Sequence, residues 1–139
     1  MIDRWIAALL GGGLAVNALV MLARPLGWYD AVPGVPLTGP FNIHFVRDIG
    51  MAYLVVTLGL GWFAWRPAQG WPALVCAAAF LGLHAAIHVG DASCGGNVWR
   101  DLIRDFPGVF LPALITAWIA WANRPAPAPA PSHAVAKEA

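Results

Sequence analysis

Residues 43–65 read IHFVRDIGMAYLVVTLGLGWFAW, and no charged residue follows the second turn of this run. A helix needs about 20 mostly apolar residues to cross a bilayer, because the hydrocarbon core is about 30 Å thick. The run therefore predicts a membrane-spanning helix. Its first two turns carry His44, Arg47 and Asp48, and Arg66-Pro67 follows it as a helix-breaking pair.

Three further apolar stretches are long enough to span, at about residues 5–23, 71–90 and 106–122. With 43–65 they predict an all-α fold, a four-helix transmembrane bundle over residues 1–123 with both termini on the same side. In residues 124–139 proline alternates with alanine, which predicts a flexible, extended tail.

The overall composition agrees with a membrane protein whose main partner is the lipid bilayer. About 60% of the residues are hydrophobic and 11% are charged, against roughly 25% charged in soluble domains. So few charges exclude an ordinary soluble enzyme, because they could not cover its surface. The net charge of +1 gives no field that would attract phosphates, so we expect no nucleic-acid partner.

Basic residues outside the spans are nearly balanced between the two sides. Because Arg47 falls inside a span, the balance tips slightly towards the side of the termini. We therefore expect cytoplasmic termini, in the inner membrane of a bacterium, and refer to the opposite side as the outer side. The bases on the side of the termini are Arg4, Arg66, Arg124 and Lys137, and those on the outer side are Arg24, Arg100 and Arg104.

Ionisable residues inside a membrane are costly, and here they gather on two of the spans. At 100° per residue, His84, His88 and Asp91 fall within about 60° of one helix face, and His44 and Asp48 lie about 40° apart. Counted from the outer ends of their spans, the residues within roughly 10 Å of the outer boundary are His44, Asp48, His84 and His88.

Depth brings further residues to the same level. At about 1.5 Å per residue, Asp48 and His84 both lie about 9 Å inside the span, and Asn17 of the first span has a similar depth. Sequential antiparallel helices are usually neighbours. We therefore expect one polar site near the outer face, supported by Asn17 and Arg47.

Cofactor binding is one use of such a site. His44, His84 and His88 could bind a transition metal, and Asp48 or Asp91 could be a further ligand or orient an imidazole. Alternatively, His44 with His84 or His88 could hold a b-type haem between helices.

Other uses remain open. The polar residues could lock helices together in a homo-oligomer, or in a non-catalytic subunit or assembly partner of a membrane complex. They could also relay protons, ions or a small molecule. No catalytic nucleophile stands out, which favours a role other than enzyme. The segment Arg100-Asp101-x-x-Arg104-Asp105 predicts a solvated amphipathic turn, or a group of charges over the mouth of the site.

The run Asn42-Ile43-His44-Phe45-Val46-Arg47-Asp48-Ile49-Gly50-Met51-Ala52-Tyr53 resembles a pattern found in small bacterial four-helix integral membrane proteins, broadly DoxX-like in size and layout. The His84, His88 and Asp91 set goes with it. The resemblance covers the bundle without the tail. It implies a bacterial origin and two motifs that act together, and it carries no activity that can be transferred.

Overall fold

The structure, a computed structural model, describes residues 1–126, which form helices and irregular connections without a strand. The long helices are α1 (Ile2–Ala23), α3 (Ile43–Trp65) and α4 (Pro67–Cys94). A fourth helical unit runs from α5 (Val98–Asp105) into α6 (Leu111–Ala122). All four are long and apolar enough to cross a membrane. The all-α four-helix transmembrane fold is therefore confirmed, whereas most of the predicted tail, from residue 127 on, lies outside the described residues.

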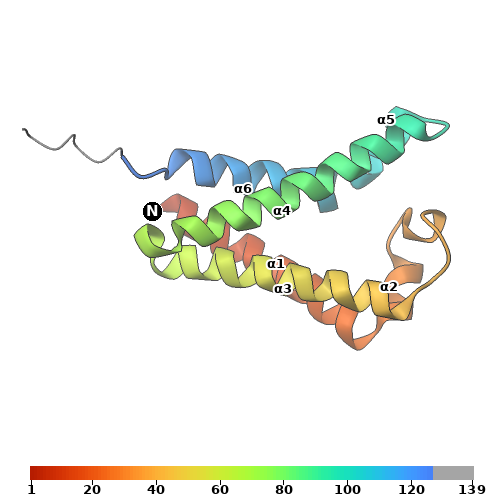
Figure 1. Cartoon of the computed structure of the whole chain (residues 1–139), viewed down its shortest axis with the longest axis horizontal. Helices are drawn as coiled ribbons and strands as arrows, with labels where there is room; N and C mark the ends of the chain where they lie inside the picture. Colours follow the sequence, from red (N-terminus) through yellow and green to blue (C-terminus); the bar gives the residue numbers. More distant parts are fainter. Residues whose placement is uncertain (127–139) are drawn as a thin grey trace, which may run out of the picture.

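The helices pack in the order α1, α3, α4, α6, each chiefly against the next, and Figure 1 shows them running along one long axis. Asn123, at the end of α6, donates a hydrogen bond of 3.1 Å to Asp3 in the first turn of α1. This bond joins the start of α1 to the end of α6, so the first and last helices of the bundle begin and end on the same side, as predicted. We call it the terminal end, and we call the other end, which carries α2 (Pro25–Ala31) and α5, the loop end.

Glycines let the helices approach closely towards the terminal end. A Cβ atom on Gly70 would lie 2.5 Å from the backbone nitrogen of Phe63, and one on Gly59 would lie 2.9 Å from the carbonyl oxygen of Ala73. On the opposite side of α3, Gly11 faces Leu60 at 3.3 Å by the same measure. Small residues thus allow these apolar helices to pack closely.

The third span is longer than the predicted 71–90, because α4 begins at Pro67 and ends at Cys94. Proline fits the first helical turn, where its missing N–H has no partner to lose. At the other end the predicted limit at residue 90 is too early, because residues 91–94 continue the helix. Ser93 donates a hydrogen bond of 2.7 Å to the carbonyl of Val89, and Gly95 follows Cys94 as the C-cap of the helix.

The fourth span is also longer than predicted, because α5 precedes it. Asn97 caps α5 by accepting a hydrogen bond of 3.0 Å from the backbone N–H of Arg100. A π-helical turn, Phe106–Phe110, then joins α5 to α6. Pro112 cannot donate a bond to the preceding turn, and this widened turn accommodates the break just before it. The helical unit is therefore interrupted by a π turn just before Pro112.

The loop end is braced by residues that sequence analysis had assigned to the polar site. Asn17 accepts a hydrogen bond of 2.9 Å from the indole N–H of Trp28 in α2, which holds that short helix against α1. Arg47 reaches from α3 to the carbonyl of Leu22 at 3.3 Å, near the end of α1. Both residues thus join helices at the loop end.

Candidate functional site

Two imidazoles lie one above the other on α4. The ring centroids of His84 and His88 are 4.8 Å apart, with the ring planes inclined by 66°. Their spacing of four residues puts both on one face of the helix, as the sequence predicted. Both residues are partly buried, so that face is shielded without being closed.

Aromatic rings enclose the deeper imidazole. Phe80, one turn earlier on α4, stacks parallel to His84 with centroids 6.1 Å apart, and Tyr53 of α3 meets it edge-on at 5.9 Å. Tyr53 is itself buried. These contacts fix the orientation of the His84 ring, while none of the hydrogen bonds found within residues 1–126 involves its nitrogens.

A carboxylate from α5 holds the shallower imidazole. His88 Nδ1 lies 2.8 Å from Asp105 Oδ2, and the two side chains are 26% and 10% exposed. Because α5 follows the turn at the end of α4, its last residue returns to the level of His88. Asp105 thus orients this ring by binding its Nδ1 atom, and the Nε2 atom of His88 faces away from Asp105.

Asp105 is in turn bound by a guanidinium. Arg104 Nε lies 2.7 Å from Asp105 Oδ1, and Arg104 Nη1 lies 2.8 Å from Asp101 Oδ1. A charge-assisted pair of this kind is stronger than a neutral hydrogen bond. We call His88, Asp101, Arg104 and Asp105 the loop-end network.

The loop between α2 and α3 covers this network. The backbone of Gly34 packs so closely on Arg104 that a Cβ atom there would lie 2.5 Å from its Nε. Gly34 also has a φ of +90°, a left-handed conformation that glycine adopts without steric cost. The network therefore connects α4, α5 and this loop.

The polar residues of α3 form a separate pair. His44 Nε2 lies 3.5 Å from Asp48 Oδ2, and the two side chains are 85% and 60% exposed. Neither is among the residues that contact the imidazoles of α4. Asp91, predicted beside His88, is exposed as well. The structure thus brings together His84 and His88 of the predicted set and leaves His44, Asp48 and Asp91 apart from them.

The arrangement offers a metal ion two ligands from one chain. Within residues 1–126 no group of three or more His, Cys, Asp or Glu side chains stands close enough to hold a metal ion. The third ligand that the sequence predicted, His44, is not beside the other two. Two imidazoles with a carboxylate behind one of them nevertheless match the usual way in which a protein orients a metal-binding histidine.

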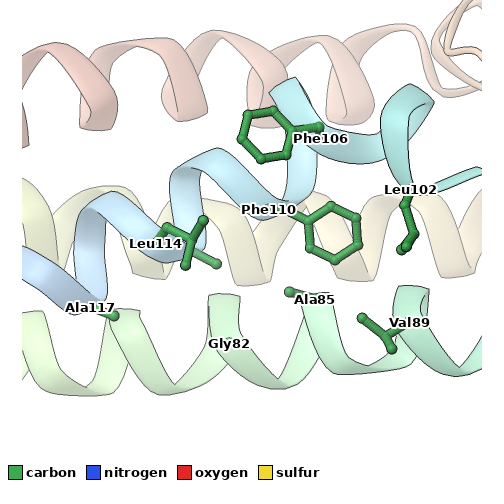
Figure 2. Close-up of a pocket in the computed structure, with 9 residues that line it drawn as sticks. Gly82, Ala85, Val89, Leu102, Phe106, Phe110, Leu114 and Ala117 are labelled. Atoms are coloured by element: carbon green, nitrogen blue, oxygen red, sulfur yellow. The ribbon is translucent and has the colours of Figure 1, made fainter. Parts of the chain in front are cut away.

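An apolar groove lies on the neighbouring face of α4 (Figure 2). It has a volume of about 530 Å³ and faces the π turn and α6. Its lining residues are all apolar, and none of them is charged. The lining residues are Gly82, Ala85, Val89, Leu102, Phe106, Phe110, Ala113, Leu114 and Ala117.

Asp101, Arg104 and Asp105 were not among the predicted site residues. The sequence did contain a signal, because residues 100–105 alternate base and acid directly before an apolar span. Of the two interpretations of that segment, charge over the mouth of the site fits the observed contacts, whereas a solvated turn does not. Choosing between them required knowing that the chain turns back after Cys94.

In comparisons with known proteins, no family model, curated protein or solved structure matches this chain. The resemblance to small bacterial four-helix membrane proteins therefore stays a prediction.

Proposed function

We propose that this chain is a multi-pass membrane protein that binds one transition-metal ion through His84 and His88. The 2.8 Å contact between His88 Nδ1 and Asp105 carries the proposal. A carboxylate on Nδ1 fixes the tautomer that leaves Nε2 as a lone-pair donor, and it holds the ring in one orientation. His84 supplies the second donor from one turn earlier on the same face.

Two imidazoles occupy two positions of a tetrahedral ion, and the remaining positions would take water or a small ligand. Imidazole donors suit zinc, copper, iron and nickel. An ion with open positions at one end of a membrane bundle could serve in transfer or redox chemistry.

A haem fits this geometry less well than a simple ion. His84 and His88 lie one turn apart on one helix, so they cannot stand on opposite faces of the same porphyrin. His44, the partner that the sequence offered across the bundle, points into the surroundings beside Asp48. We therefore favour a metal ion, and a haem becomes an outcome of the test.

The test is elemental analysis and an optical spectrum of the protein purified in mild detergent. We expect about one metal ion per chain. The double variant His84→Leu/His88→Leu should lose it and keep the helical circular-dichroism signal, because Asp105 keeps its bond to Arg104. His44→Leu is the matched control, since it removes an exposed imidazole and should retain the metal.

Three outcomes would contradict the proposal. A colourless protein without metal would exclude both cofactors, and a Soret band would indicate haem instead. If the double variant fails to fold while His44→Leu folds, the imidazoles serve the structure of the bundle.

A second candidate function is that of a non-catalytic subunit or assembly partner whose polar residues lock the fold. The observation that favours it is Arg104, which pairs with two acids of α5 and packs on the backbone of Gly34. Co-purification of a stable partner protein, together with normal folding and no metal, would favour this function over the first.

For the cellular location we propose the inner membrane of a bacterium, with cytoplasmic termini. The support is the sequence count, in which four basic residues fall on the side of the termini and three on the other side once Arg47 is assigned to a span. A fluorescent protein fused to the C-terminus should fluoresce in cells, and an alkaline phosphatase fusion there should be inactive. The reverse pair of results would invert the orientation.

A further inference from the structure

One face of α3 is left uncovered along its whole length. Its exposed residues follow one another at intervals of four and three, so they form one stripe along the helix. The buried residues of α3 lie on the other side, against α1 and α4. The stripe consists of His44, Asp48, Met51, Val55, Leu58 and Trp62.

The stripe has a polar pair where a lipid-facing surface should have none. Asp48 lies six residues into α3, about 9 Å along the helix, and its side chain is 60% exposed. Charged groups within a membrane normally face a bundle interior or a water-filled cavity. Asp105 and Arg104 follow that rule, since they pair with each other and are 10% and 28% exposed. His44 and Asp48 therefore require a cover that residues 1–126 of the single chain do not supply.

We propose that a second copy of this chain covers the stripe, α3 against α3, in a two-fold dimer. A second copy inserted in the same direction presents its own His44 and Asp48 at the same depth. A two-fold axis along the membrane normal then gathers two imidazoles and two carboxylates. The imidazole of each copy can then pair with the carboxylate of the other, so the surface is complementary to itself.

The other end of the stripe is shaped for close contact. Gly61 has no atom within 4 Å of the place where a Cβ would be. Around it lies a shallow groove of about 540 Å³, lined by Thr57, Leu58, Gly61, Trp62 and Trp65. A small residue on an open helix face allows a second helix backbone to approach. The stripe thus has a polar pair that a second copy can complement at one end, and a surface that a second helix can approach closely at the other.

The test is cysteine cross-linking in native membranes. Cys76 and Cys94 are both free and exposed, so both are first replaced, as Cys76→Ala and Cys94→Ser. Val55→Cys then places one thiol in the middle of the stripe, where the residue is 68% exposed. Leu83→Cys on α4 is the matched control, because Leu83 is 70% exposed and also lies within a span. A short bis-maleimide should join Val55→Cys into a dimer and leave Leu83→Cys monomeric.

Any of three results would overturn the dimer. The first is absence of a Val55→Cys adduct although the thiol reacts with a monofunctional maleimide. The second is equal cross-linking of both variants, which would indicate random collision. The third is a Val55→Cys adduct with a different protein, which would assign the stripe to another partner.

A second variant tests the polar pair itself. Asp48→Leu in the Val55→Cys background should lower the yield of dimer roughly tenfold, because neither copy then supplies a carboxylate to the interface. Among the side chains of the described residues, Asp48 forms an ion pair with His44 alone, so the variant should fold, and circular dichroism checks this. An unchanged yield would remove the polar pair from the interface and overturn the arrangement.

Discussion

Two histidine–carboxylate pairs at the loop end differ in almost every physical respect. His44 and Asp48 are four residues apart on α3, 3.5 Å from each other, and largely exposed. His88 and Asp105 are 17 residues apart on different helices, 2.8 Å from each other, and largely covered. Exposed ion pairs contribute little to stability, whereas shielded, hydrogen-bonded pairs interact strongly. The pair evident from sequence spacing is therefore the weaker one within a single chain.

Unfolding in detergent, measured after removal of a carboxylate, should show the largest difference between the two pairs. Asp105→Leu leaves Arg104 and His88 without their shared partner, and should lower the free energy of unfolding by roughly 2–3 kcal/mol. If the loss is no larger than that of a surface substitution, the loop-end network does not stabilise the fold.

Metal affinity should separate the two pairs as well. Asp105→Asn keeps the size of the side chain but removes the charge behind His88, so metal affinity should fall about 10–100-fold. Asp48→Asn is the control and should leave the affinity unchanged. Titration with Zn²⁺ or Cu²⁺, followed by calorimetry, measures both. Equal losses would show that the two carboxylates act in one site.

A smaller effect should follow from the loop that covers the network. Gly34→Ala adds a Cβ against Arg104 at a φ of +90°, and should destabilise the protein by about 1–2 kcal/mol. Gly96→Ala is the matched control, because nothing lies within 4 Å of that position. Thermal melting monitored by circular dichroism distinguishes the two variants. Equal melting temperatures would mean that the loop can shift to accommodate the added Cβ without loss of stability.

The smallest effect should come from the exposed pair. In dilute detergent, where copies are separated, His44→Leu should change the free energy of unfolding by about 0–1 kcal/mol. A larger loss would show that His44 has a stabilising contact inside the single chain, which would contradict its 85% exposure.

Much of the candidate site followed from spacing alone. Four residues between His84 and His88 place both rings on one face of any α-helix, so no tertiary information was needed for that pair. The bounds of α3 likewise followed from the long apolar run and the Arg66-Pro67 break. The third ligand was harder to predict, because equal depth of His44 and His88 says nothing about the direction in which each side chain points.

The sequence by itself determined that the chain forms four apolar helices with both ends together, because bilayer thickness and hydropathy leave few alternatives. It also determined which residues share a helix face. Only the tertiary structure decided that Asp105 is the partner of His88, and that His44 and Asp48 face outward. Helical periodicity fixes relative angles along one helix, whereas the rotation of each helix against its neighbours depends on packing, such as the glycine contacts between α3 and α4.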